Sequence, residues 1–380
     1  MHSHNLFLNQ AGKLGNVRRF LTLGWFVFCL VVIALWALLP LPPALVDTVY
    51  TRGLYRGIAA VLVPVTGATA LPVLPILVAV LLVWLIVGTA WRRRRPFRPR
   101  GWQAFLHGFY GLLIGVVTIW ALFILLWGEN YARTPLETHL QLSTDTEPSM
   151  LDIISLTESL GNIIRQTETS TPDWDADLEA AQASLRRVTD SLERRPVTLP
   201  RFVKRTPPGV LLYTGRATGI TSPWTLEAYV DSALPYPIQL ATALHENAHI
   251  AGYTGEAEAD FVTGLAGLTA ENASVRYSTA LSLFQRSLQN LTPERTGPTY
   301  EDLPARAKRD LEALRQAYTR YAPPPAITAA ERRIYDSYLK TQGVGAGVAD
   351  YDRVSVLLMA AQRDGIIEFD WEETLLHPPE

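Results

Sequence analysis

Cysteine is almost absent from the 380-residue chain, whose single cysteine, Cys29, lies in an apolar run. The chain therefore cannot close a disulfide within itself or bind a metal through a cysteine cluster. Any metal must be held by His, Asp or Glu side chains. A charge excess is also lacking, since the formal net charge is -2. A broad nucleic-acid-binding surface needs a clear basic excess, so we expect no nucleic acid among the partners.

Apolar residues are abundant, and they are concentrated before residue 130. Three uncharged stretches, residues 20–39, 71–91 and 104–127, each reach the roughly 20 residues that a helix needs to cross a bilayer core of ~30 Å. A cleaved signal peptide would explain only the first stretch, which is already long for one. We therefore expect a multi-pass membrane domain over residues 1–129, with the lipid bilayer as a partner.

The segment between the first two stretches mixes apolar residues with charged ones, among them Asp47, Arg52 and Arg56. A helix over about residues 44–66 that lies in the membrane interface fits this mixture better than a fourth span. The segment could equally pack on the soluble part of the protein.

Residues 130–380 are predicted to form a mainly helical soluble domain. Apolar residues recur at helical spacing in 150–166 and 174–194. Between residues 196 and 236 the chain is rich in proline and holds two β-prone runs, GVLLY near Val210 and TLEAYV near Thr225. These runs predict two short strands or one hairpin with a loop, so the domain is expected to have a short β hairpin or an edge strand.

The stretch HENAH, residues 245–249, follows the pattern HExxH. Histidines four residues apart lie on one face of a helix, so the imidazoles of His245 and His249 can reach one metal ion. Glu246 points to the space beside that ion and can act as the general base that takes a proton from an activated water. The pattern therefore predicts one catalytic Zn²⁺ ion. Gly252 is expected to end the helix, and two ordinary structural histidines are the alternative interpretation.

A catalytic zinc ion usually has three protein ligands, and three carboxylates follow the motif: Glu256, Glu258 and Asp260. A helix that begins near Thr254 puts Glu256 and Asp260 on one face and aims Glu258 roughly 200° away from Glu256. We assign Glu256 as the third ligand and Asp260 as the outer carboxylate that orients a histidine. Glu258 is interpreted as a solvated charge, and it becomes an equal candidate if the segment is not helical.

Five other residues are weaker candidates. Tyr338, Lys340 and Tyr351 flank a glycine-rich turn, and a tyrosine or lysine can stabilise the oxyanion of a tetrahedral intermediate. Packing at helix ends is the commoner role of such tyrosines. Glu227 and Tyr229 lie in the expected strand before the HENAH helix, where a strand edge beside the metal can pair with an extended substrate.

Several longer stretches carry a resemblance: VDTVYTRGLYRGI, ENYARTPL, TGITSPWTLEAYV, HENAH with GEAEADF, and YDSYLKTQGVGAGVADYDRV. Over nearly its whole length the chain resembles a bacterial membrane family called domain of unknown function 3810. The resemblance implies a location in the bacterial inner membrane, and the family name implies no established activity.

In its motif this family is similar to the gluzincin peptidases. In the CAAX-prenyl-protease-like gluzincins, the HExxH element is followed by a later ExxAD element whose first glutamate binds zinc. EAEAD is similar to that element, with Glu256 first and Asp260 last. In those peptidases the two elements are widely separated, whereas here Glu256 follows His249 by seven residues. Gly252 fits the metzincin pattern HExxHxxGxxH, but Gly255 stands in place of its third histidine.

The leading hypothesis is a mainly α protein with three transmembrane helices and a zincin-like metallopeptidase domain over residues 130–380. Its substrate would be a peptide or protein outside the cytoplasm. The competing hypothesis is a zinc-stabilised membrane sensor or scaffold without activity. Glu246 discriminates between them, because a structural zinc site needs ligands but no general base. Hydrolysis of a non-peptide amide or of a cell-wall peptide crosslink is a third possibility.

A topology prediction follows from the arginine-rich link RRRRPFRPR, residues 92–100, and from Lys13, Arg18 and Arg19 before the first stretch. Both segments belong in the cytoplasm by the positive-inside rule. Three crossings then put residues 130–380 outside it. A reporter enzyme fused after Glu380 should be active only in the periplasmic or external space, and activity in the cytoplasm would contradict this topology.

Overall fold

The computed structural model describes residues 2–93, 101–144, 148–168, 171–341, 353–369 and 374–376. Contacts between Cα atoms divide the chain into two compact units. The first consists of Met1–Pro42 and Pro75–Glu129, and the second of Pro43–Leu74 and Asn130–Glu380. The chain thus leaves the first unit after Pro42, returns to it at Pro75, and leaves it again after Glu129.

Three long helices make up the first unit: α1 (His2–Leu38), α4 (Val73–Arg93) and α5 (Trp102–Leu126). Their segments Phe20–Leu38, Val73–Trp91 and Trp102–Leu126 are long and apolar enough to cross a membrane, which confirms the prediction of three such helices. Helices α1 and α5 contact each other. In this contact Trp25 Nε1 donates a hydrogen bond of 3.0 Å to Thr118 Oγ1.

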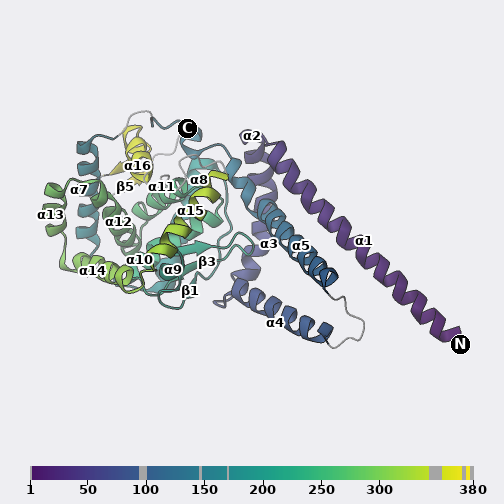
Figure 1. The fold of residues 1–380 in the computed structure, drawn as a ribbon. Coiled ribbons are helices and arrows are strands. Elements are labelled where there is room, and N and C mark those ends of the chain that lie inside the picture. The colour runs from purple at the N-terminus through teal and green to yellow at the C-terminus, as the bar shows by residue number, and fades with distance from the viewer. Residues whose placement is uncertain are drawn as a thin grey trace. The chain divides into compact units, whose positions relative to one another are not determined.

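Helices also dominate the second unit (Figure 1). The longer ones are α3 (Arg56–Thr66), α7 (Met150–Thr167), α8 (Trp174–Glu193), α10 (Tyr236–Ile250), α11 (Glu256–Leu268), α12 (Ala273–Ser287), α14 (Ala305–Arg320), α15 (Pro325–Thr341) and α16 (Val354–Arg363). The shorter helical segments of the chain are α2 (Pro43–Leu45), the π-helix η1 (Val46–Tyr55), the 3₁₀ segments η2 (Gly128–Ala132) and η3 (Leu288–Asn290), α6 (Leu136–His139), α9 (Val210–Gly215) and α13 (Pro293–Glu301).

A small three-stranded sheet lies beside α10, with strand order β1–β3–β2. The central strand β3 (Ala228–Asp231) pairs in parallel with β1 (Lys204–Thr206) and antiparallel with β2 (Gly219–Thr221). A separate antiparallel hairpin is formed by β4 (Ile367–Phe369) and β5 (Thr374–Leu376). The mainly helical fold with few strands agrees with the sequence prediction.

The strand expected at GVLLY is wrong, because these residues form the short helix α9. Apolar runs of this length do not distinguish a strand from a buried helix. The carboxylate of Asp231 stabilises the helix, because it accepts hydrogen bonds from N–H groups that have no partner within the first turn of a helix. Its donors are the N–H groups of Gly209, Leu211 and Leu212, at 2.7, 2.9 and 3.2 Å.

Helix α10 lies in the interior of the second unit, where α8, α11, α12, α14, β2 and β3 contact it. Most of its residues are buried, and they include Glu246, Asn247 and His249 beside apolar residues. A helix buried on most sides depends on the elements that cover it. The HENAH sequence is therefore held in a buried helix that α11 and strands β2 and β3 contact.

The predicted helix over about residues 44–66 is present as a continuous helical run through α2, η1 and α3. One face is buried and carries Tyr50, Tyr55 and Val63, while Val61 and Val65 are each 70% exposed. By its contacts this run belongs to the second unit, and its position in a membrane interface stays a prediction. The exposed side carries apolar residues, among them Val61 and Val65, together with Arg52 and Arg56, and this mixture suits a lipid surface.

Candidate metal centre

His245 and His249 lie one turn apart on α10, and their rings face the first residue of α11. The ring centroids are 4.6 Å apart and the ring planes are nearly perpendicular, at 87°. Gly252 ends the helix as expected: its φ of +98° is a left-handed conformation that favours glycine. The chain then reverses and begins α11 at Glu256 rather than near Thr254.

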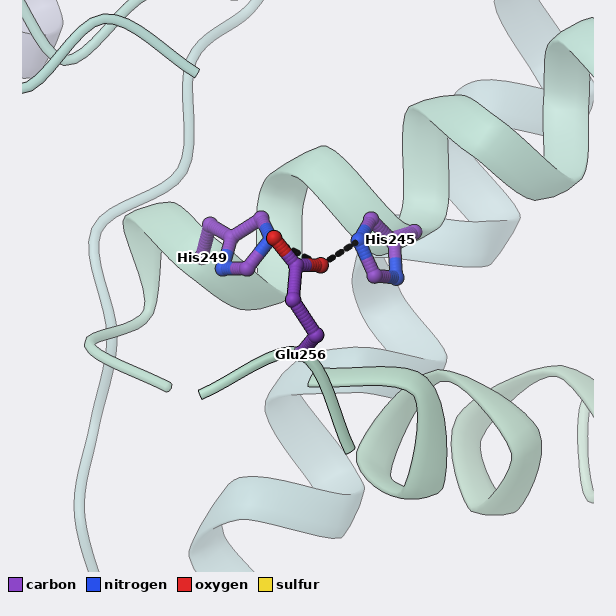
Figure 2. Close-up of side chains that lie close together, drawn as sticks. All are labelled: His245, His249 and Glu256. Atoms are coloured by element: carbon purple, nitrogen blue, oxygen red, sulfur yellow. Dashed lines mark ion pairs between the residues drawn. The ribbon is translucent and has the colours of Figure 1, made fainter. Parts of the chain in front are cut away.

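This reversal brings Glu256 between the two histidines (Figure 2). Its Oε2 atom lies 3.3 Å from His245 Nε2 and 3.3 Å from His249 Nε2. The ligand atoms of the three residues all lie within 4.8 Å of one another. Among the described residues, these three side chains form the one group of this kind that has a geometry suited to a metal ion.

The outer nitrogen of each histidine has a partner of its own. Asp260 Oδ1 lies 2.8 Å from His245 Nδ1, and Asp260 is held in turn by Arg286. His249 Nδ1 lies 2.7 Å from the carbonyl oxygen of Tyr253. A carbonyl can only accept a hydrogen bond, so Nδ1 of His249 carries a proton. Both Nε2 atoms are thereby turned inward, as in histidines that bind a metal.

The charges of the site favour a cation at its centre. Burial lowers the pKa of His245, but the neighbouring Asp260 and Glu256 outweigh burial and raise this pKa well above its usual value. Burial raises the pKa of Glu256, but the two histidines hold this pKa well below its usual range. Positive charge beside the carboxylates is therefore stabilised, and a divalent cation can take the place of the imidazole protons.

The distances from Glu256 to the two histidines fit zinc. Zinc bonds to histidine nitrogen and carboxylate oxygen are about 2.0–2.2 Å long, so two ligand atoms of a tetrahedral zinc ion lie roughly 3.3–3.5 Å apart. The two contacts of Glu256 have this length. Charge-assisted hydrogen bonds are usually shorter, at about 2.7–2.9 Å. The donor set of two imidazoles and one carboxylate also suits zinc.

Glu246 points from α10 toward the sheet rather than into the cluster of three. Thr221 Oγ1, on β2, donates a hydrogen bond of 2.7 Å to Glu246 Oε2. A Cβ atom at Gly219, on the same strand, would lie 2.6 Å from Glu246 Oε1, so only glycine fits there without a shift. Burial raises the pKa of Glu246, although the two histidines and Thr221 oppose this effect.

A family comparison agrees with the resemblance seen in the sequence. The family model described as "Protein of unknown function (DUF3810)" matches residues 50–359, which is most of the chain and includes the whole candidate metal centre. The chain belongs to the DUF3810 family. No curated protein and no solved structure matches it.

The helical phase of α11 separates the three carboxylates of this DUF3810 protein. Glu256 and Asp260 both face the histidines, whereas Glu258 faces away and accepts a hydrogen bond of 2.5 Å from the N–H of Leu136. Burial raises the pKa of Glu258, and Arg133 opposes this effect. Glu258 is therefore not simply a solvated charge, since it binds the start of α6.

The weaker candidates lie elsewhere or beyond the described residues. Strand β3 has a neighbour on both sides, so Tyr229 has no free edge to offer a substrate. Glu227 accepts hydrogen bonds from the N–H groups of Val73 and Leu74 and from the Tyr229 hydroxyl. Lys340 forms an ion pair with Asp336 within α15. The side chain of Tyr338, and Tyr351 as a whole, lie outside the described residues.

Sequence reasoning missed three residues at the site of this DUF3810 protein: Thr221, Tyr253 and Arg286. Tyr253 had a detectable signal, because the residue after a helix-ending glycine turns back toward the last turn of the helix. Thr221 lies within TGITSPWTLEAYV, but nothing in that stretch indicates its contact with Glu246. Arg286 reaches Asp260 from α12, and no local pattern predicts such a contact.

Substitution of the three carboxylates should separate their roles. Glu256→Ala should lose bound zinc as severely as His249→Ala, because each removes one of three protein ligands. Asp260→Ala should weaken zinc binding about 10- to 100-fold, the usual effect of losing an outer partner of a ligand. Glu258→Ala should retain zinc. Metal content of the purified variants measures this; a zinc-free Glu258→Ala beside a zinc-replete Glu256→Ala would show that the wrong carboxylate was assigned.

Proposed function

We propose that this chain is a membrane-anchored zinc metallopeptidase of zincin type that hydrolyses peptide bonds. The proposal rests chiefly on the placement of Glu246. This residue is buried on α10 directly after His245, its carboxylate contacts strand β2, and it is not one of the three clustered side chains. Thr221 holds its carboxylate in place. A carboxylate so placed is suited to proton transfer beside the ion rather than to binding it.

When bound, a zinc ion supplies Lewis-acid chemistry that lowers the pKa of a water molecule to about 7. His245, His249 and Glu256 would hold the ion, and Asp260 with Tyr253 would keep the two imidazoles oriented. Glu246 takes a proton from the attacking water and passes it to the leaving amine. The hydrogen bond from Thr221 keeps the Glu246 carboxylate oriented for this transfer.

The number of ligands favours an enzyme over a zinc-stabilised scaffold. Structural zinc sites usually have four protein ligands, whereas catalytic sites have three and leave one position for water or substrate. In the described part of the chain the group comprises His245, His249 and Glu256. A scaffold would also leave the position of Glu246 beside the site unexplained.

Strand β2 favours a peptide as the substrate. It lies at the edge of the three-stranded sheet, and its residue Thr221 contacts Glu246. The residue before it on the strand, Ile220, is 52% exposed. An extended peptide can add to such an edge through main-chain hydrogen bonds, which a non-peptide amide would make less well.

The location proposed for this activity is the outer side of the bacterial inner membrane. Its support is the three apolar helices together with the arginine-rich link of residues 92–100, which the positive-inside rule assigns to the cytoplasm. Substrates would then be peptides or proteins close to the membrane surface.

Replacement of Glu246 by glutamine tests the mechanism. Glu246→Gln should abolish hydrolysis of a peptide library while leaving bound zinc nearly unchanged, because the amide keeps the shape of the side chain but cannot accept the proton. Glu258→Gln is the matched control, since it changes a carboxylate on α11 that faces away from the cluster. It should keep both zinc and activity.

Two outcomes would oppose the mechanism. Hydrolysis retained by Glu246→Gln would remove this residue from the reaction, and loss of zinc together with activity would give it a different role. A wild-type protein that binds zinc but cleaves no peptide in the library would favour the scaffold hypothesis.

A further inference from the structure

The turn that follows α10 fixes the second histidine through its backbone. The N–H of Gly252 donates to the carbonyl of His249 at 2.9 Å, and the N–H of Tyr253 donates to the carbonyl of Ala248 at 3.2 Å. These two bonds and the positive φ of Gly252 form a Schellman motif. The motif aims the carbonyl of Tyr253 back at His249 Nδ1. The orientation of the His249 ring therefore depends on where this turn is held.

Side chains from distant segments hold the turn. The last carbonyl groups of a helix lack partners within it. Tyr55 Oη donates a hydrogen bond of 2.8 Å to the carbonyl of Ile250, and Arg195 Nη1 donates one of 2.5 Å to the carbonyl of Ala251. A Cβ atom at Gly252 would lie 3.0 Å from Arg195 Nη1, so the glycine also permits this close approach.

The side chain of Tyr253 is held just as firmly. The guanidinium groups of Arg133 and Arg195 lie 4.9 and 5.0 Å from the centre of its ring, at cation–π distance. Its hydroxyl donates to Glu193, which also forms ion pairs with Arg133 and Arg195. Burial raises the pKa of Glu193, but the two arginines outweigh burial and lower it to about 2. Glu193 is thus charged, and it forms ion pairs with both arginines in a buried cluster.

Two of these residues come from segments that border the apolar helices. Tyr55 ends η1, which lies in the link between the first and second apolar helices, and Arg133 follows shortly after α5 ends at Leu126. The two segments also bind each other: Thr51 Oγ1 donates to Asn130 Oδ1 at 3.0 Å, and Asp47 lies 3.8 Å from Arg133 Nε. π-Helical segments are rare and are often found at functional sites.

We propose that Tyr55, Arg133 and Arg195 are positioning residues of the metal centre, through which the membrane-adjacent segments hold the turn of residues 250–253 and thereby orient His249. None of the three residues needs to touch the ion, since each acts through Ile250, Ala251 or Tyr253. This inference rests on the proposed function and extends it. Residues of the stretches VDTVYTRGLYRGI and ENYARTPL would then support the metal centre by holding the turn beside His249. Metal affinity then depends on the segment that carries Tyr55, almost 200 residues before the histidines.

If Tyr55, Arg133 and Arg195 only stabilise the fold, a different effect on metal binding is expected. Loss of the Tyr55 hydroxyl would then lower the free energy of unfolding without changing how the folded protein binds a metal. Tyr277 provides the comparison, because it is also buried and its hydroxyl donates a hydrogen bond of 2.7 Å to Asp310 Oδ2. Like Tyr253 it lies beside an arginine, Arg306, at 4.3 Å. Tyr277 lies on α12, and its bond has no part in the turn after α10.

The experiment uses the full-length protein in detergent, loaded with cobalt(II) in place of zinc. Cobalt affinity is measured by competition with a chelator, and the visible absorption spectrum reports the coordination geometry. Tyr55→Phe should bind cobalt about tenfold more weakly, the lower end of the effect expected for outer partners of a ligand, with a changed spectrum. Tyr277→Phe should match the wild-type affinity and spectrum. Arg195→Lys, which keeps the charge but not the planar fork, should change in the direction of Tyr55→Phe.

The outcomes separate this inference from the function on which it rests. If Tyr55→Phe and Arg195→Lys are folded and bind cobalt with the wild-type affinity and spectrum, the positioning role is wrong while the metal centre stands. If Tyr55→Phe and Tyr277→Phe weaken cobalt binding equally, the effect is one of general stability and the positioning role is again wrong. A wild-type protein that binds neither cobalt nor zinc would overturn the proposed function and this inference together.

Discussion

Charge compensation at the junction of α10 and α11 is the constraint on which the site depends. Glu256 and Asp260 are buried carboxylates, and an isolated buried charge costs several kcal/mol. The two histidines of α10 and Arg286 of α12 supply the opposite charge. The tight turn at Gly252 makes this compensation possible, because it returns the chain to the histidines within seven residues. A divalent cation would complete the same balance of charge at the centre of the cluster.

The parts predictable from sequence are those that local periodicity determines. An uninterrupted apolar run of about 20 residues favours a membrane-spanning helix, so the three apolar segments were predictable within a few residues at each end, although α1 itself begins at His2. The HENAH spacing and the phase of the following helix placed His245, His249, Glu256 and Asp260 on facing surfaces, and the structure brings these residues together. Few residues separate these four side chains in the sequence, so helical geometry alone predicts which of them face one another.

Long-range contacts determined what the sequence did not reveal. Asp231 turns an apolar run near Val210 into a helix from a position twenty residues away, and Arg286 reaches Asp260 from another helix. The strand that contacts Glu246 is the three-residue β2, which is too short to have a periodic signal. The boundary between units also follows contacts rather than composition, since residues 43–74 group with residues 130–380.

X-ray absorption at the zinc edge of the purified full-length protein is the most direct test of the metal centre. We expect one zinc ion per chain, with two imidazole nitrogens and oxygen ligands at about 2.0–2.2 Å. Imidazole rings scatter in a recognisable pattern, so the two histidines can be distinguished from a site made of carboxylates alone. A first shell without imidazole, or a protein that takes up no zinc when the ion is supplied in excess, would contradict the assignment of His245, His249 and Glu256.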